Sequence, residues 1–152
     1  MKQKFGFEAL MLSIIFLISQ PLHANDADVA NWTQKVLLTT LSVSFDDKKK
    51  HYEEVRPFYS YEAWHALESF FSQYLDTIEN QKLTLQPAAI GQPIVLHSGV
   101  VKDNNFFNGL QYWMVEQSFY IPELQLNTHF AVLVLSEGRG DLQIWTINVK
   151  LD

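Results

Sequence analysis

The histidines and the acidic residues near them are the first candidates for metal or acid–base chemistry. Those that follow residue 24 are His51, His65, His97 and His129. They fall in separate segments of the chain, and the one short-range pair with metal-ligand spacing is Glu62 with His65. A di-iron bundle needs two such Glu-x-x-His pairs and two further glutamates. The spacing therefore predicts no metal site, and we interpret His65 as a helix-surface or packing residue.

The sequence also lacks the pattern of a catalytic nucleophile or a phosphate-binding loop. Ser44, Ser60 and Ser98 are not flanked by the glycines of a hydrolase nucleophile turn. The glycines are isolated or lie in turns, so none forms a loop that could cradle a phosphate. The absence of cysteine excludes disulfides, cysteine catalysis and a lipid-modified N-terminal cysteine. We therefore expect no catalytic residue, no cofactor and no metal.

Composition and charge describe a globular domain that does not bind nucleic acid. Of the 152 residues, 47% are hydrophobic and 14% are aromatic, so the chain can build a core rich in ring packing. The net charge is -6, and the only arginines are Arg56 and Arg139. Nucleic-acid binding relies on clustered basic residues that neutralise phosphates. We therefore expect no nucleic-acid partner.

The first 24 residues have the pattern of an export signal. Lys2 and Lys4 precede the apolar run Ala9–Ser19, which is shorter than the roughly 20 residues of a membrane-spanning helix. We expect cleavage after Ala24 and a single periplasmic domain at 25–152. The loss of two lysines and one glutamate then changes the net charge from -6 to -7. The alternative is a retained anchor that keeps the domain near the inner membrane.

Apolar spacing and capping residues predict two helices directly after the export segment. Asn25 or Asp26 is the expected cap of a helix that runs to about Leu41. The sequence then turns at Ser-Phe-Asp, and Ser44 or Asp46 is the expected cap of a short second helix. That helix ends before the proline at position 57, because the residue before a proline disfavours helical geometry.

A third predicted helix is the most aromatic part of the chain. Ser60 is its expected cap, and Tyr59 and Trp64 have the spacing of a hydrophobic staple. The helix is expected to bend or fray at 76–81. Its apolar stripe consists of Trp64, Leu67, Phe71, Tyr74 and Leu75.

Beyond Lys82 the apolar period changes from helical to alternating, which predicts strands. We expect Gly91–Pro93 to separate the first strand from the second. Helices followed by an antiparallel meander predict an α+β fold with the helices packed on one face of a curved antiparallel sheet. The five predicted strands are 83–90, 93–101, 110–120, 126–136 and 142–150.

The alternation also predicts which side chains of the strands face the helices. Tyr112 and Glu116 alternate with the inward residues and are expected to face away. The inward residues are bulky enough to fill the interior, but a pocket for a small molecule stays open as an alternative. The predicted inward set is Trp113, Val115, Phe130, Val132, Trp145 and Ile147.

Several segments resemble, in order and spacing, the DotI/IcmL family of type IVB secretion systems, which is related to conjugation proteins. The resemblance implies a periplasmic domain with a nuclear-transport-factor-like or cystatin-like cone and no active site. It also implies secretion-core proteins as partners, with a homo-oligomer among the expected assemblies, in a machine used for virulence or conjugation. The segments are Ser44–Asp46, Phe58–Phe71, Ala88–Leu96, Tyr112–Phe119 and Phe130–Leu135.

The N-terminus departs from this family, whose members have a cytoplasmic tail and a membrane-spanning helix. Only eight residues precede the apolar run in this chain. The first hypothesis is therefore a non-enzymatic assembly module that is either a core component or a soluble periplasmic paralogue. The alternative hypothesis is a periplasmic small-molecule-binding protein or enzyme that uses the cone-shaped pocket.

Phe106 and Phe107 are the candidate partner-contact residues. They lie between two asparagines and an Asn-Gly turn, where a polar connection between strands is expected. Two interpretations remain open at this point. The pair either folds back to plug the edge of the sheet, or it is exposed and contacts a partner.

Overall fold

The computed structural model describes residues 24–102, 106–136 and 141–151. The predicted export segment lies almost entirely outside these residues, as does most of the hairpin tip between the last two strands. Within the part that is described, no helix is long and apolar enough to cross a membrane.

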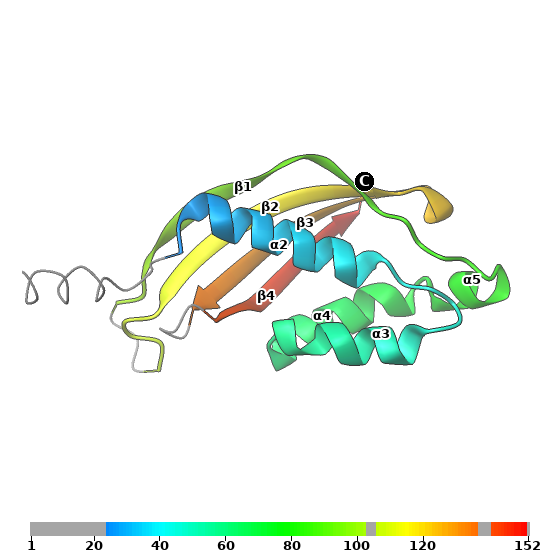
Figure 1. The fold of residues 1–152 in the computed structure, drawn as a ribbon, viewed down its shortest axis with the longest axis horizontal. Helices are drawn as coiled ribbons and strands as arrows, with labels where there is room; N and C mark the ends of the chain where they lie inside the picture. Colours follow the sequence, from blue (N-terminus) through cyan, green and yellow to red (C-terminus); the bar gives the residue numbers. More distant parts are fainter. Residues whose placement is uncertain (1–23, 103–105, 137–140, 152) are drawn as a thin grey trace, which may run out of the picture.

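Helix α2 (Asp26–Leu41) lies across one face of the sheet (Figure 1). Asn25 caps it as predicted, because its Oδ1 accepts a 2.8 Å hydrogen bond from the backbone N–H of Asp28. Residues with helical spacing form one buried stripe that faces the strands. Its apolar members are Val29, Ala30, Val36, Leu37 and Leu41.

Three shorter helices and a 3-10 turn connect α2 to the sheet. Ser60 caps α4 as predicted, since its Oγ accepts a 3.0 Å hydrogen bond from the Ala63 N–H. The cap prediction for α3 is wrong, because Asp47 precedes this helix and makes no side-chain capping bond. Ser44 Oγ donates instead to Asp46 Oδ1 at 2.5 Å, which closes the corner before the helix. These elements are α3 (Lys48–Val55), η1 (Arg56–Phe58), α4 (Tyr61–Ser72) and α5 (Leu75–Asn80).

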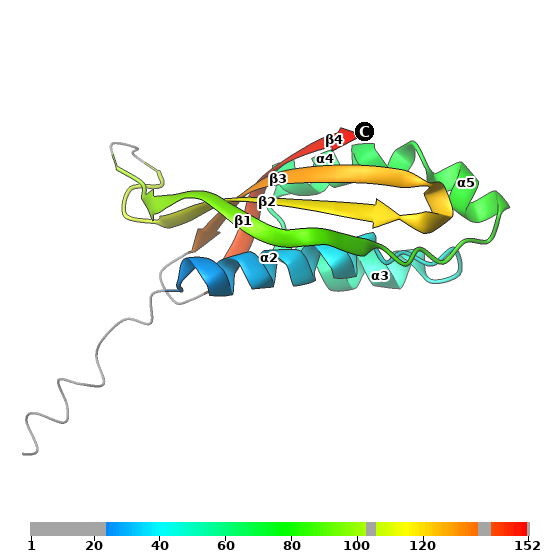
Figure 2. The ribbon, with the colours of Figure 1, turned by 90° about the horizontal axis from the view of Figure 1, so that it is seen from above.

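The sheet has four strands in the described residues, where five were predicted. They form an antiparallel meander of order β1-β2-β3-β4, and a 3-10 turn, η2 (Pro122–Leu124), joins the middle two. Helix α2 packs along β1, and α4 packs along β4 (Figure 2). The predicted α+β fold with helices on one face of a curved antiparallel sheet is confirmed. The strands are β1 (Ala88–Val100), β2 (Gln111–Ile121), β3 (Leu126–Ser136) and β4 (Leu142–Leu151).

The two strands predicted on either side of Gly91 are one strand with a bulge. Ile90 pairs with Ser118 and Ile94 pairs with Glu116, so three residues of β1 lie opposite one residue of β2. Gly91 has a φ of +70°, a left-handed conformation that glycine adopts without strain. The glycine and proline that suggested a break therefore bend the strand without ending it.

The side chain of Gln117 holds this bulge in place. It is 2% exposed, and its Nε2 donates to the carbonyl oxygens of Ile90 at 3.1 Å and of Ser118 at 2.8 Å. Its Oε1 accepts a 2.8 Å hydrogen bond from Nε2 of Gln34 on α2. One buried amide thus satisfies backbone groups at the bulge and ties the helix to two strands.

The core lies between the helices and the inward face of the sheet. Trp113 and Phe130 are 3% and 0% exposed, as their predicted inward positions require. Trp145 does not belong to this set. A register shift in the β3–β4 pairing places Ile144 opposite Val134, so Ile144 is buried and Trp145 becomes the extra residue of a bulge.

Tyr59 joins the helical layer to the edge strand β4 from a buried position. It forms a single parallel β-bridge with Ile144, and its hydroxyl lies 2.6 Å from Thr40 Oγ1 on α2. Burial raises the pKa of the Tyr59 hydroxyl far above its usual value, while the hydrogen bond to Thr40 acts in the opposite direction.

Raising the pH into the alkaline range is expected to lower the free energy of unfolding less in the Tyr59→Phe variant than in the wild type. A folded pKa above the unfolded value means that stability is fully present below about pH 10 and falls as the pH rises above it. One such group contributes a slope of up to about 1.4 kcal/mol per pH unit. Above about pH 10, the free energy of unfolding should therefore fall less steeply with pH in the variant, and the difference in slope should correspond to about one proton. Urea unfolding of both proteins at a series of pH values measures it, and equal slopes would contradict the assignment.

Candidate assembly surfaces

The connection between β1 and β2 places its two phenylalanines differently. Phe106 is 90% exposed, the highest fraction among the large apolar side chains described. Phe107 is half-buried, and its ring packs edge-on against Trp145 with the centroids 5.1 Å apart. Each of the two interpretations left open by the sequence therefore holds for one residue: Phe107 packs on the sheet, and Phe106 is exposed.

The end of β1 and the start of β2, between which Phe106 lies in the sequence, are at the end of the molecule where α2 begins (Figures 1 and 2). Trp113, at the start of β2, donates from Nε1 to Asp26 Oδ1 at 3.1 Å and so fixes the first turn of α2 beside the sheet. Asp26 and Asp28 are both exposed. We call this region, whose described residues include the exposed Phe106, Asp26, Asp28 and Lys102, the Phe106 end.

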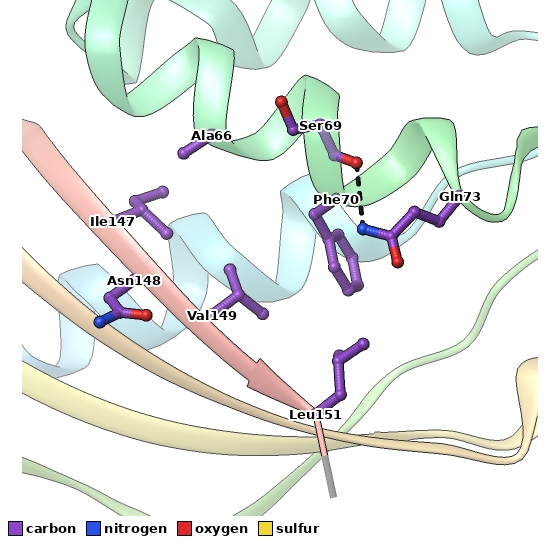
Figure 3. Close-up of a pocket in the computed structure, with 8 residues that line it drawn as sticks. All are labelled: Ala66, Ser69, Phe70, Gln73, Ile147, Asn148, Val149 and Leu151. Carbon is purple, nitrogen blue, oxygen red and sulfur yellow. Dashed lines mark hydrogen bonds between the residues drawn. The ribbon is translucent and has the colours of Figure 1, made fainter.

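A groove of about 290 Å³ lies between the second half of α4 and the last residues of β4. Ile147, Val149 and Leu151 point from the strand toward the helix, and the helix and strand diverge along it (Figure 3). No charged side chain lines this space. We call it the α4–β4 groove, and its lining residues are Ala66, Ser69, Phe70, Gln73, Ile147, Asn148, Val149 and Leu151.

The groove lies toward the end of the sheet that is opposite to Phe106. Strand β4 starts beside the Phe106 end and runs away from it, and the groove is at its last residues (Figure 1). Sequence reasoning missed this site. Its two walls are far apart in the chain, and neither apolar spacing nor any motif indicates that a helix and a strand will diverge.

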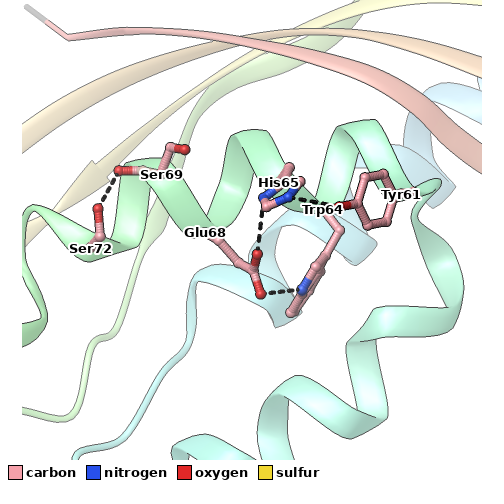
Figure 4. Close-up of polar contacts among 6 residues, drawn as sticks. All are labelled: Tyr61, Trp64, His65, Glu68, Ser69 and Ser72. Carbon is pink, nitrogen blue, oxygen red and sulfur yellow. Dashed lines mark hydrogen bonds and ion pairs between the residues drawn. The ribbon is translucent and has the colours of Figure 1, made fainter.

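The outward face of α4 carries a chain of polar aromatic contacts (Figure 4). The Tyr61 hydroxyl lies 3.0 Å from His65 Nε2, and His65 Nδ1 lies 3.3 Å from Glu68 Oε2. Trp64 Nε1 donates to the other oxygen of Glu68 at 2.7 Å. His65 is exposed, which confirms its interpretation as a helix-surface residue. Across the described ranges, no group of three or more His, Asp or Glu residues could hold a metal ion.

A shallow depression of about 350 Å³ lies between α3 and α4. The Arg56 guanidinium sits 5.6 Å from the centre of the Trp64 ring, a cation–π contact. The Tyr52 hydroxyl is buried there without a hydrogen-bond partner among the described residues, and burial, aided by the nearby Glu68 carboxylate, raises its pKa. The rim carries two cations and two carboxylates, so its charge favours neither an anionic nor a cationic ligand.

The face of the sheet opposite the helices carries paired polar side chains among its apolar ones. Tyr112 donates to or accepts from His97 Nδ1 at 3.1 Å, and Glu116 lies 3.6 Å from His129 Nε2. Ser118 is 2.9 Å from the other nitrogen of His129. Tyr112 and Glu116 therefore face away from the core, as predicted, and their polar atoms have partners on that face.

Comparison with known proteins assigns the chain to a family. A model described as the type IVb secretion system DotI/IcmL inner-membrane complex component matches 11–118. The comparison with curated protein sequences gives no match.

Three solved structures have the same fold at low sequence identity. The periplasmic domain of DotI is 18% identical, with a TM-score of 0.70 over 86% of this chain and 99% of that domain. A periplasmic fragment of TraM is 15% identical, with a TM-score of 0.71 over 86% of this chain and 100% of the fragment. An IcmL-like type IV secretion system protein from Legionella pneumophila is 11% identical, with a TM-score of 0.58 over 85% and 94% of the two chains.

The structural likeness shows the fold alone, whereas the family model covers more than two thirds of the sequence. The chain therefore belongs to the DotI/IcmL family of type IVb secretion systems.

Proposed function

We propose that the protein is a non-enzymatic assembly module that acts in the periplasm by binding other proteins of a type IV secretion or conjugation apparatus. The family and the structural neighbours point to a component of such an apparatus. The observation that carries the protein-binding role is Phe106, which is 90% exposed. An apolar side chain of this size at the tip of a connection is typical of an anchor in a protein interface.

The packing of the interior favours this role over a small-molecule pocket. Trp113 and Phe130 are almost fully buried between the sheet and the helices, together with Val115 and Val132. Small-molecule sites need a concave space of about 300–1,000 Å³ with a few polar groups directed into it. The inward residues of the long strands fill the place where the cone-shaped pocket would lie.

We also propose that the protein is exported and that residues 1–24 are removed. The supporting observation is the short apolar run that follows two lysines and ends at Gln20-Pro21. The N-terminal residue of the protein purified from its native cells tests this proposal. A mature chain that starts at Asn25 supports cleavage, whereas recovery of Met1 in the membrane fraction supports a retained anchor.

Affinity purification from native cells tests the assembly role. A C-terminal tag on the chain, followed by chemical cross-linking in intact cells and mass spectrometry, identifies the proteins in contact with it. Recovery of other secretion or conjugation proteins is the expected result. A chain that cross-links to no component of such an apparatus, at wild-type abundance, would contradict the proposal.

The Phe106→Ser variant is expected to reduce the recovery of partners by about tenfold without changing the melting temperature, because an exposed side chain contributes little to folding. Phe107→Ser removes a ring that packs on Trp145, so it should lower the melting temperature. Tyr61→Ser removes a second exposed ring, 70% exposed, and serves as the matched control. Loss of thermal stability in Phe106→Ser with unchanged recovery of partners would disprove the contact.

A further inference from the structure

The second half of strand β4 is an open edge of the sheet beside the α4–β4 groove. We infer that an extended segment of a partner protein adds to this edge as a further strand, with apolar side chains in the groove and an acidic side chain near Lys150. This inference rests on the proposed function, because it names a surface of the assembly module and the kind of segment that this surface binds.

The chain itself pairs with the outer edge of β4 only near the start of this strand. The Ser60 N–H donates to the Ile144 carbonyl at 2.9 Å, and Ser60 Oγ donates to the Trp145 carbonyl at 2.6 Å. The chain then enters α4, which diverges from the strand (Figure 3). In the part of the chain that the structure describes, no segment pairs with the outer edge of 146–151. The backbone N–H and C=O groups of this edge are therefore open to an added strand.

The open part of β4 is regular, unlike the opposite edge of the sheet. From 146 to 151, each residue of β4 pairs with β3 without a register shift. Strand β1, at the other edge, contains Pro93 and two register shifts. Proline and bulges disfavour the addition of another strand, whereas a regular edge offers backbone donors and acceptors at a constant spacing. Of the two edges, β4 is therefore the one that can accept a strand.

The backbone edge of β4 forms part of the groove wall. Ile147, Val149 and Leu151 point toward α4, and Asn148, which alternates with them, lines the same space (Figure 3). Successive side chains of a strand lie on opposite faces of the sheet, so the backbone between these residues borders the groove as well. A strand that pairs with β4 therefore places every second side chain between β4 and α4.

The groove has the size for side chains of an extended segment and not for a helix. An apolar cavity of about 150 Å³ holds one benzene molecule, so the groove of about 290 Å³ holds about two side chains of that size. One turn of an α-helix is about 10 Å across and about 5.4 Å long, which requires roughly 420 Å³. No charged side chain lines the groove, and Ile147 and Val149 are half-buried there. The side chains that enter it are therefore expected to be apolar.

Lys150 is the charged residue of this open edge. It alternates with Val149 and Leu151, so it faces away from the helices, and its side chain is exposed. Among the described residues Lys150 forms no ion pair, and its neighbour on β3, His129, already lies 3.6 Å from the Glu116 carboxylate. Opposite charges on adjacent strands attract each other. The side chains of the added strand that face away from α4 are therefore expected to include an acidic one.

A short synthetic peptide tests strand addition directly. The probe is fluorescein-labelled Ser-Val-Glu-Val-Glu-Val-Ser, which alternates apolar and acidic side chains. Its control replaces the central valine with proline, which removes a backbone donor without changing the charge. Fluorescence anisotropy with the protein purified from its native cells measures the affinity for each peptide. Amide hydrogen exchange of the protein, with and without the probe, locates the bound strand.

Two variants test the groove and the charge separately. Ser69→Phe fills the groove from the exposed side of α4, and Ser72→Phe, which adds the same ring outside the groove lining, is its control. Lys150→Glu reverses the charge beside the added strand, and Lys35→Glu makes the same change on the exposed side of α2 as its control. All of these positions are exposed, so each variant is expected to keep the melting temperature of the wild type.

The expected result is that the probe binds and that amide exchange slows at 146–151. The proline in the control peptide and the Ser69→Phe substitution should each weaken binding at least tenfold, whereas Ser72→Phe should bind like the wild type. Lys150→Glu, unlike Lys35→Glu, should weaken binding of the probe about three- to fivefold and favour a peptide with lysines in place of the glutamates. No binding at millimolar peptide, equal binding of the proline peptide, unchanged binding in Ser69→Phe, or protection on β1 in place of β4 would each overturn the inference.

A second copy of the chain is the other possible occupant of this edge. Sedimentation equilibrium of the protein without peptide detects it, and a mass that rises with concentration in the wild type but not in Ser69→Phe would overturn the inference.

Failure of this inference can be told apart from failure of the proposed function. If the probe does not bind while secretion proteins still cross-link to the chain in cells, strand addition is wrong and the assembly role stands. If the probe binds at β4 while no apparatus protein cross-links to the chain, strand addition stands and the assembly role is wrong.

Discussion

Shortening Phe130 to alanine is expected to lower the free energy of unfolding by about 3–5 kcal/mol, the usual cost of a phenylalanine cavity in a core. The ring is 0% exposed and packs edge-on against Phe70 of α4 and Phe119 of β2, with centroid distances of 6.0 Å and 5.8 Å. It therefore joins the helical layer to two strands. Since domains of this size are stable by only about 5–15 kcal/mol, a large share of the stability would be lost.

Urea unfolding followed by circular dichroism measures this loss. Phe45→Ala is the matched control, because Phe45 is 36% exposed and its truncation should cost far less. A loss for Phe130→Ala no larger than that for Phe45→Ala would show that the ring does not connect the two layers.

Replacement of Gln117 by leucine is expected to lower the free energy of unfolding by about 2–4 kcal/mol, although leucine is more hydrophobic than glutamine. The substitution removes the side-chain donor of the part-buried hydrogen bonds to the Ile90 and Ser118 carbonyl oxygens, and each polar group left without its partner at such a site costs about 1–3 kcal/mol. The effect should be local as well as global. Amide hydrogen exchange should accelerate most around Gly91, where the bulge loses its support.

Gln34→Ala provides the matched control for the amide network. It removes the hydrogen bond between α2 and Gln117 but leaves the bonds from Gln117 to the β1 and β2 carbonyls in place. Its expected cost is about 1 kcal/mol, the net value of one hydrogen bond. If Gln117→Leu is as stable as the wild type, the bulge is held by backbone geometry alone.

The layers of the fold follow from local sequence signals, but the number of strands does not. Asn25 and Ser60 cap their helices because the cap and its target are within three residues, so the pattern is visible in the sequence. The Gly91–Pro93 segment has the composition of a turn in isolation. It remains within a strand because Gln117, on the neighbouring strand, occupies the space opposite it.

Trp145 illustrates a second limit of sequence reasoning. Alternation predicts it to face inward with Ile147, and this would hold if the pairing between β3 and β4 were regular. The single register shift moves Ile144 into the inward position. A bulge reverses the face of every residue on one side of it, and the sequence around Trp145 carries no glycine or proline that would indicate one.

Phe106 and the α4–β4 groove also differ in how far the sequence predicts them. The polar neighbours of Phe106 indicate its exposure, because a phenylalanine pair among asparagines is unusual in a connection between strands. The α4–β4 groove depends on the angle between a helix and a strand, and that angle results from packing over the whole core. Local sequence therefore predicts the exposed ring of Phe106 but not the groove.

The irregular pairing of β1 also bears on aggregation. Ile90, Ile94, Leu96 and Val100 are each about half exposed on this long edge strand, a composition that could template fibrils. Its longest regular stretch, however, is His97–Val100, because register shifts interrupt the pairing with β2. Steric zippers require about six or seven residues in one register. The bulge that Gln117 supports thus limits how far fibril growth can propagate from an edge that otherwise has the side chains for it.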